Sequence, residues 1–155
     1  MTSERTTVAG RSRSGMTREE TIAFFKRREE AHEDLDASAL AADYADYAVI
    51  ESPATGVHRG REAAERAFRA VFTAFLDLTT KVDDLIVDGD RAALVLSIEG
   101  THIGEFLGMP PTGKRCTMSA VFFYELENGR IARERHVYDF TGLLVQIGLL
   151  KAKPA

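Results

Sequence analysis

The sequence is poor in the residues that build metal clusters, disulfides and membrane spans. It has one cysteine, no tryptophan and four histidines in 155 residues. The single cysteine, Cys116, excludes an internal disulfide framework and a thiolate zinc cluster. The histidines lack the spacing of a zinc site, so we expect no metal. No apolar run approaches the roughly 18–20 residues of a membrane span, so no membrane partner is expected.

The composition is that of one globular domain. Hydrophobic residues make up 45% of the chain and charged residues 28%, and a chain of about 150 residues can bury one sizeable core. The net charge of −4 argues against a nucleic-acid partner, because phosphates demand a basic surface. The chain also lacks a phosphate-binding glycine loop followed by lysine, and it lacks a serine nucleophile elbow.

Charge is divided unevenly between the start of the chain and the rest. Residues 1–16 hold three arginines against one glutamate, a net +2, which leaves −6 for the remainder. This segment has almost no large apolar side chains, so we predict a disordered tail. It lacks the apolar stretch of a secretory signal, which predicts a cytoplasmic protein. A single folded domain is expected over residues 17–150, followed by a short tail at residues 151–155.

Helical signals dominate the first half of the chain. Thr17 and Glu20 fit a capping box for a helix that runs to about residue 34. A second, short helix is predicted over residues 38–44. Residues 61–76 give the clearest helix, because apolar side chains recur there at helical spacing. A last short helix is expected over residues 141–147.

Strand signals dominate the second half. Two short strands are expected at residues 48–52 and 57–58. Longer strands at residues 78–87 and 91–103 are joined by Asp88-Gly89-Asp90, and strands at residues 114–126 and 130–140 by Asn128-Gly129. Both connections are typical of hairpins. Helices followed by long, mainly antiparallel strands predict an α+β fold, in which N-terminal helices cover one face of a curved sheet.

Alternation along the two central strands predicts which face lies under the helices. Leu94, Leu96 and Ile98 share one face with His102, and the next strand presents the apolar series from Cys116 to Tyr124. A broad apolar and aromatic face under a helical roof predicts a pocket for a hydrophobic small molecule. Its expected apolar wall residues are Phe72, Phe106, Met118, Ala120, Phe122 and Val137.

Three basic side chains fall on these apolar faces. His32 lies in the apolar arc of the first helix, where it is either a ligand contact or a core histidine bonded to a backbone carbonyl. Arg28, one turn earlier, either lines the pocket or extends along its stem to solvent. His102 ends its strand beside a glycine-rich loop at residues 104–113, which predicts a place at the pocket rim.

Asp139 ends the last predicted strand. A carboxylate at the mouth of an apolar pocket can accept and return a proton, because desolvation makes it more basic. The same residue precedes Thr141 and Gly142, where it would instead cap the last helix. Alternation leaves both roles open, since Asp139 lies on the same face of the strand as the apolar Val137 but also as the charged Arg135.

Five ordered motifs carry a resemblance to a known family. They are SP at 52–53, GVHRG at 56–60, GTHIG at 100–104, GMPPT at 108–112 and DFTGLLVQIG at 139–148. In order and spacing they are similar to the SnoaL-like polyketide cyclases of the nuclear transport factor 2-like superfamily. The resemblance covers residues 17–150 and implies a cone-shaped α+β fold.

The resemblance also implies a reaction. Cyclases of this family close the last ring of an aromatic polyketide by an intramolecular aldol condensation, without metal or cofactor. Asp139 matches their acid–base aspartate, which removes a carbon-bound proton and later protonates the new alkoxide. His102 matches the family histidine ahead of the glycine loop, which is expected to shape the mouth of the pocket.

Three positions depart from the family pattern. Ser52 stands where the cyclases carry a pocket asparagine, and Ala120 and Phe122 stand where they carry a glutamine and a histidine. Either the substrate is less polar, or the chain has kept the fold and changed the reaction. Ketosteroid isomerases of this fold place their aspartate at the position of Ser52. Of the Asp–Arg–Asp set of related epoxide hydrolases, Asp139 matches one member, but no strand carries a matching Arg-x-Asp pair.

Three hypotheses follow. The chain is a cofactor-free cyclase or isomerase acting on a polycyclic or ketone-bearing molecule, a binding protein that uses the same pocket without chemistry, or an interaction domain. Val121 and Phe123 on the outward face predict a homodimer or higher homo-oligomer through the outer sheet face. Such an assembly is compatible with all three hypotheses.

Overall fold

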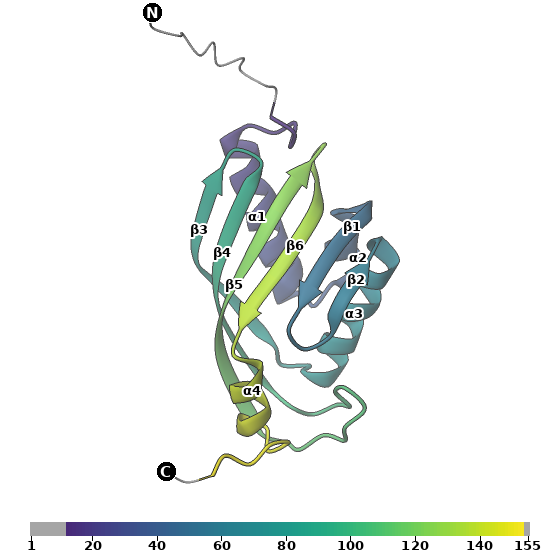
Figure 1. The fold of residues 1–155 in the computed structure, drawn as a ribbon, viewed down its shortest axis with the longest axis vertical. Coiled ribbons are helices and arrows are strands. Elements are labelled where there is room, and N and C mark those ends of the chain that lie inside the picture. Colours follow the sequence, from purple (N-terminus) through teal and green to yellow (C-terminus); the bar gives the residue numbers. More distant parts are fainter. Residues whose placement is uncertain (1–11, 154–155) are drawn as a thin grey trace, which may run out of the picture.

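The computed structural model describes residues 12–153 (Figure 1). Capping side chains set the start of three of the four helices in that range. Thr17 and Glu20 form the predicted capping box. The Asp36 and Asp139 carboxylates cap two further helices, each by accepting a backbone hydrogen bond. The helices are α1 (Arg18–Glu33), α2 (Ala37–Ala42), α3 (Arg61–Ala74) and α4 (Phe140–Gln146).

Six strands form one mixed sheet in the order β2-β1-β6-β5-β4-β3. The two predicted hairpins are present, and Gly89, Asn128 and Gly129 have the positive φ that their tight turns require. The β1 strand runs parallel to β6 and antiparallel to β2. The strands are β1 (Tyr44–Ser52), β2 (Gly56–Arg59), β3 (Thr79–Asp88), β4 (Arg91–Thr101), β5 (Arg115–Glu127) and β6 (Arg130–Tyr138).

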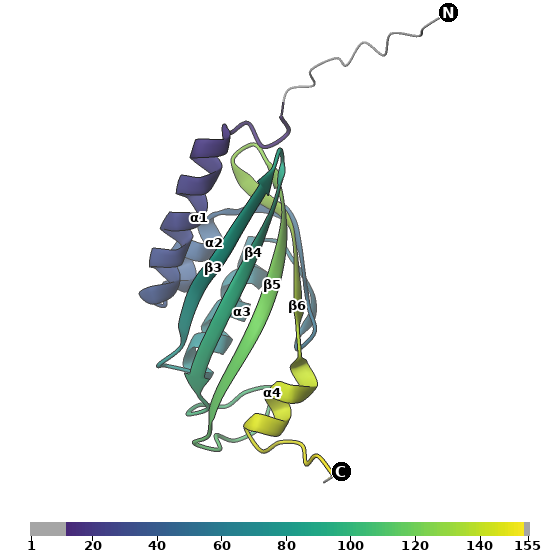
Figure 2. The same ribbon diagram turned by 90° about the vertical axis from the view of Figure 1, so that its left-hand side faces the viewer.

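The helices α1, α2 and α3 lie on one side of the curved sheet (Figure 2). Contacts join α1 to β3, α2 to α3, and α3 to β1, while α4 packs against β5 at the end of the sheet. This arrangement confirms the predicted α+β architecture. Among residues 12–153, no helix combines the length and the apolar character that a membrane crossing requires.

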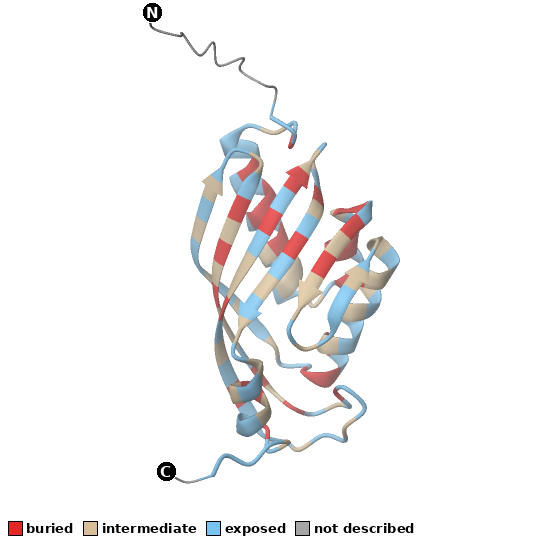
Figure 3. Ribbon diagram, viewed as in Figure 1, coloured by how far each residue is buried: buried red, intermediate tan, exposed pale blue. Residues whose placement is uncertain are grey.

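Buried and exposed residues alternate along β5 and β6 (Figure 3). Cys116, Ala120 and Tyr124 are buried on the side of the helices, as alternation predicts, whereas Phe123 is half exposed on the other side. Burial of a large apolar side chain stabilises the folded state by about 1.5–3 kcal/mol. A slip of one residue in either strand would reverse this distribution, so the core fixes the register.

Residues 12–16 are held against the sheet, which corrects the prediction of a disordered tail over residues 1–16. Ser14 is fully buried, and its backbone N–H donates a hydrogen bond of 2.9 Å to the Asp90 carboxylate. The Gly129 N–H donates to the Ser14 carbonyl. Backbone groups therefore anchor this segment to both hairpin turns. Such hydrogen bonds do not depend on apolar side chains, so the low apolar content of the segment does not predict them. The remainder of the predicted tail, residues 1–11, and residues 154–155 lie outside the described residues.

Candidate active site

A cavity of about 160 Å³ lies between the sheet and the helices α1 and α3. A loop residue, Phe106, and Leu143 of α4 contribute to its wall at the α4 end of the sheet. Such a wall suits a small organic molecule. Most of the wall is aromatic or aliphatic: Ile50, Phe68, Val71, Phe72, Phe75, Leu78, Ile98, Phe106, Met118, Phe122 and Leu143.

Six of the residues expected in the pocket line this cavity. They come from α1, β1, α3, β5 and the loop after β4, so the fold gathers positions that are far apart in the sequence. The Ser52 hydroxyl already has a partner, the Tyr138 hydroxyl at 3.1 Å. Within residues 12–153, no group of three or more His, Cys, Asp or Glu side chains is arranged to hold a metal ion. The six residues are His32, Ser52, Phe72, Phe106, Met118 and Phe122.

The β6 strand supplies an ionisable group of side chains on the cavity wall. Glu134, His136 and Tyr138 alternate along β6, and all three line the cavity. His136 Nε2 lies 2.5 Å from Glu134 Oε1, and the Tyr44 hydroxyl donates a hydrogen bond to the same carboxylate. Burial alone would raise the pKa of the Glu134 carboxyl, but His136, Arg28 and Tyr44 outweigh burial and hold that pKa below its ordinary value. The cavity wall therefore carries an ionised carboxylate bonded to an imidazole.

The alternation of inward and outward residues along β6 indicates this group. Arg133 and Arg135 point to solvent, so the residues between and beyond them point inward. Neither Glu134 nor His136 was predicted as a site residue. A glutamate and a histidine next to two solvent-facing arginines resemble surface residues in the sequence.

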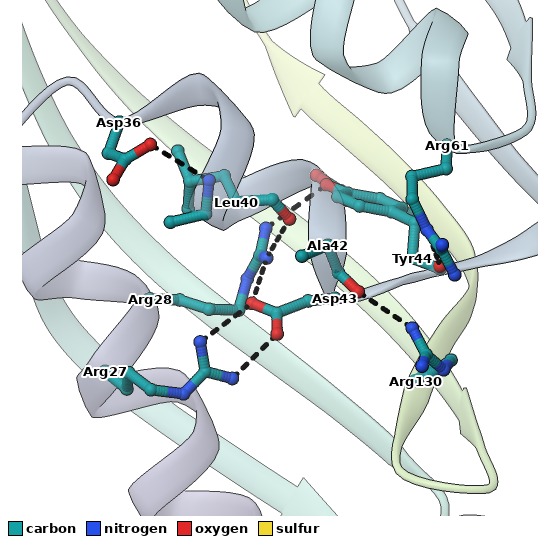
Figure 4. Close-up of polar contacts among 11 residues, drawn as sticks. Arg27, Arg28, Asp36, Leu40, Ala42, Asp43, Tyr44, Arg61 and Arg130 are labelled. Atoms are coloured by element: carbon teal, nitrogen blue, oxygen red, sulfur yellow. Dashed lines mark hydrogen bonds and ion pairs between the residues drawn. The ribbon is translucent and has the colours of Figure 1, made fainter.

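Arg28 neither lines the cavity nor reaches solvent, so both expectations for it are wrong. The residue is 2% exposed. Its guanidinium donates to the Leu40 carbonyl and to Asp43 Oδ2, each at 2.9 Å, and to the Tyr44 hydroxyl at 3.2 Å (Figure 4). The neighbouring Arg27 binds the same Asp43 carboxylate from the solvent side, at 2.7 Å. Acceptors from α2 and from the start of β1 therefore satisfy the buried charge.

His32 lines the cavity as a neutral ring. Burial, and after it the charge of Arg28, lowers the pKa of His32 from 6.5 to about 3. Its ring meets Phe68 and Phe72 edge to face. Among the described residues, its buried Nδ1 atom has no hydrogen-bond partner. The alternative of a core histidine bonded to a backbone carbonyl is therefore wrong.

Asp139 lies outside the cavity and caps α4. Its carboxylate accepts a hydrogen bond of 2.8 Å from the Gly142 N–H, and the residue is exposed. Val137 is likewise 50% exposed on the outer face. The expectations that Asp139 opens into the pocket and that Val137 lines it are wrong, because both residues follow the outward parity of Arg135.

His102 and Ala120 are buried and do not line the cavity, so the expectations of His102 at the rim and of Ala120 on the wall are also wrong. His102 Nδ1 lies 3.0 Å from the Thr112 hydroxyl oxygen, which joins the two ends of the loop that carries Phe106. The His102 ring also packs against Phe75 and Phe106, both of which line the cavity. Ala120 belongs to the core cluster beneath α1, where its short side chain lies below the wall.

A comparison with models of protein families places the chain in a known family. The family model for SnoaL-like polyketide cyclase matches residues 23–147, a range that contains every residue of the cavity wall. The chain belongs to the SnoaL-like polyketide cyclase family. A curated relative of this SnoaL-like protein is nogalonic acid methyl ester cyclase from Streptomyces nogalater. The two are 29% identical over 108 residues, which cover 68% of this chain and 78% of the relative.

Solved structures agree with the family assignment. AclR from Streptomyces galilaeus, provisionally named a hydroxylase, is 26% identical with a TM-score of 0.76, and the match covers 89% of this chain and 87% of AclR. IdmH from Streptomyces antibioticus, provisionally named a polyketide cyclase, is 30% identical with a TM-score of 0.69. That match covers 82% of this chain and 97% of IdmH.

In this SnoaL-like protein β6, and not β5, carries the ionisable pair of the cavity wall. Ala120 and Phe122 of β5 occupy the positions where the resemblance expects glutamine and histidine. Their partners across the strand pair are Tyr138 and His136. Hydrogen-bonding groups are therefore present at the same level of the sheet, one strand away.

Proposed function

We propose that this SnoaL-like protein is a cofactor-independent, cyclase-like enzyme that performs acid–base chemistry on an apolar, ketone-bearing polycyclic molecule. Family membership and the curated cyclase relative support a cyclase-like role. The aromatic and aliphatic wall supports a substrate that is mostly hydrocarbon, because burial of apolar surface contributes about 25 cal/mol per Å².

The observation that carries the proposal is the carboxylate–imidazole pair of Glu134 and His136 on a wall that is mostly apolar. A proton acceptor in a cavity of low polarity is what enolate chemistry requires. Burying a carboxylate costs several kcal/mol of desolvation free energy. A pocket that only bound hydrocarbon would gain nothing from such a group.

The proposed reaction needs no oxidant or reductant. A base removes a proton from the carbon next to a carbonyl, and the electrons of that C–H bond form an enolate. The enolate carbon then bonds to a second carbonyl carbon, and the proton passes to the new alkoxide oxygen. The product of this aldol step is an isomer of the substrate, and a double-bond isomerisation would share the first proton transfer.

The test is conversion of nogalonic acid methyl ester, the compound in the name of the curated relative, followed by liquid chromatography and mass spectrometry. We expect a new product of unchanged mass, formed faster than in buffer alone. A product heavier by one oxygen atom would instead indicate hydroxylation. Absence of any product would contradict the proposal for this class of substrate.

A matched pair of variants on α3 tests whether the reaction takes place in the cavity. Ala67 lines the cavity, whereas Ala70 is an exposed residue one turn further along the same helix. Ala67→Trp should fill the cavity and abolish turnover. Ala70→Trp adds the same indole outside the cavity and should leave turnover at the wild-type level.

A second candidate is a binding protein without turnover. Ala120 and Phe122 favour it, since both are apolar where the resembled cyclases carry hydrogen-bonding side chains. It predicts that the ester raises the melting temperature of the protein while no product forms. The resemblance would give the acid–base role to Asp139, but an exposed helix cap does not support that assignment.

A further inference from the structure

Five side chains form one hydrogen-bonded chain that ends at the cavity. Asp43 accepts a hydrogen bond from Arg28 at 2.9 Å, and Arg28 donates to the Tyr44 hydroxyl at 3.2 Å, a segment that can be followed in Figure 4. The Tyr44 hydroxyl in turn donates to the Glu134 carboxylate. Glu134 then bonds His136 on the cavity wall. Arg28 and Glu134 are each 2% exposed and Tyr44 is fully buried, so the middle of this network is shielded from water.

His136 is the member of this chain that keeps a ring nitrogen for another partner. An ionised carboxylate can only accept hydrogen bonds, so the Glu134 contact requires the hydrogen of a neutral His136 ring to be on Nε2. The Nδ1 atom then carries a lone pair. Within the described residues Nδ1 makes no hydrogen bond, and it is not among the fully buried polar atoms that lack a partner. It can therefore accept a further hydrogen bond, and His136 lines the cavity.

We propose that His136 is the acid–base catalytic residue of the cavity, and that Glu134 and Tyr44 are positioning residues that keep its Nδ1 lone pair directed at the substrate. This assignment rests on the proposed function. Nδ1 accepts the proton from the carbon next to a ketone, and the C–H electrons form the enolate that makes the new C–C bond. The same proton then passes from Nδ1 to the new alkoxide, so His136 ends the cycle in its starting form.

Glu134 has two roles in this scheme. Its hydrogen bond fixes the tautomer and the orientation of the His136 ring, and its charge stabilises the imidazolium that exists between the two proton transfers. Both carboxylate oxygens have partners, Oε1 in His136 and Oε2 in Tyr44. Arg28 supplies the positive charge that a buried carboxylate needs, which accounts for a buried arginine that does not line the cavity.

The first experiment compares His136→Gln with Asp139→Asn in conversion of nogalonic acid methyl ester by the full chain. Loss of a general acid–base lowers kcat/KM by about 10²- to 10⁴-fold, and we expect a loss in this range for His136→Gln. Asn caps a helix about as well as Asp, so Asp139→Asn should stay within about twofold of wild type. Activity of His136→Gln close to wild type, or an equal loss in Asp139→Asn, would overturn the assignment.

The second experiment tests the positioning residues by a readout that does not need turnover. The ¹⁵N chemical shifts of the His136 ring should report hydrogen on Nε2 in the wild-type chain and a mixture of tautomers in Glu134→Gln. The exposed Glu125→Gln on β5 is the matched control and should keep the wild-type shifts. A wild-type ring with its hydrogen on Nδ1 would overturn the proposal.

Steady-state kinetics of the Glu134 and Tyr44 variants test the same positioning role during turnover. In Glu134→Gln and Tyr44→Phe we expect kcat to fall by at least about tenfold with KM unchanged, because the residues act through His136 rather than on the substrate. Circular dichroism and melting temperature identify any variant that fails to fold, and His136→Asn then replaces His136→Gln. A wild-type chain without turnover would overturn the proposed function, whereas an active His136→Gln in an otherwise active protein would overturn only this assignment.

Discussion

The rings of Phe122 and His136 stack across the β5–β6 pair, with centroids 3.7 Å apart and planes 15° from parallel. The two residues are direct partners in the strand register. An aromatic face on one side and the Glu134 carboxylate at one edge restrict the orientation of the imidazole. Phe122 departs from the polar residue of the resembled cyclases, and in this chain it helps to orient the polar group of the neighbouring strand.

Replacing Phe122 with leucine should change the orientation of the His136 ring without changing the polarity of the cavity wall. The variant keeps an apolar wall and removes the stack, so we expect the free energy of unfolding to fall by about 0.5–1.5 kcal/mol. Turnover should fall by about tenfold or more, because a misplaced catalytic group loses much of its effect. Denaturant unfolding and steady-state kinetics measure the two effects. The control is Phe123→Leu on the outer face, and equal turnover losses in both variants would contradict this role of Phe122.

Local sequence signals were sufficient to predict the elements and the apolar part of the cavity. The capping box at Thr17 and the Asn128-Gly129 turn act through contacts between near neighbours in the chain. Alternation along β5 correctly placed Met118 and Phe122 facing the helices, because a period of two follows directly from strand geometry. These features do not depend on which distant segment packs against them.

The polar part of the site depends on such distant segments. Tyr44 and Glu134 are 90 residues apart in the sequence, and the buried Glu134 carboxylate depends on the Tyr44 hydroxyl and the charge of Arg28. A glutamate between two exposed arginines therefore looks like a surface residue until its partners are known. The same reasoning explains why Arg28 was expected to reach solvent or the pocket, since its acceptors come from α2 and the start of β1.

His32 should make the protein less stable in acid. The unfolded ring takes up a proton near pH 6.5, whereas the folded ring has a pKa of about 3, so its neutral form contributes stability that is complete above pH 6.5. As the pH falls below 6.5, this contribution is lost at about 1.4 kcal/mol per pH unit down to about pH 3. Denaturant unfolding at several pH values should show a shallower acid slope for His32→Leu than for wild type. Parallel slopes would contradict the neutral assignment.

Arg28 and Arg27 allow a buried and an exposed ion pair with the same carboxylate to be compared. Both bind Asp43, but the Arg28 side chain is 3% exposed and the Arg27 side chain 52%. Arg28→Met leaves buried acidic groups without their cation, so we expect a loss of about 3–5 kcal/mol in the free energy of unfolding. Arg27→Met should lose at most about 1 kcal/mol, because solvent screens an exposed pair. Equal losses in denaturant unfolding would contradict the buried network.

Cys116 can report whether the cavity is occupied. It is the only cysteine in the chain, it lines the cavity, and it is 7% exposed. Burial raises the pKa of its thiol, so little thiolate is present and alkylation by iodoacetamide should be slow. A bound ester should slow it several-fold further, and Ala67→Trp should do the same without ligand. Mass spectrometry follows the reaction, with Ala70→Trp as the control, and an unchanged rate with bound ligand would mean that the ligand lies elsewhere.

The sheet face opposite the helices carries exposed apolar residues together with charges of both signs. Ile86, Phe123 and Val137 are each about half exposed there. They line a hollow of about 740 Å³ that also holds acidic and basic side chains: Asp88, Arg91, Glu125, Arg133 and Arg135. In a two-fold pair, the arginines of one copy can meet the carboxylates of the other. We therefore expect two copies of this chain to pair through this face.

Phe123→Lys should disrupt that pairing, because it places a charge at the centre of the apolar part of the face. Light scattering after size-exclusion chromatography should give the mass of a dimer for wild type and of a monomer for the variant. Leu76→Lys is the control, since Leu76 is a 63% exposed apolar residue between α3 and β3, away from this face. It adds the same charge and should leave the mass of the dimer unchanged. A wild-type chain that stays monomeric at all concentrations would rule out the pairing, and the exposed apolar residues of the outer face would then need another partner.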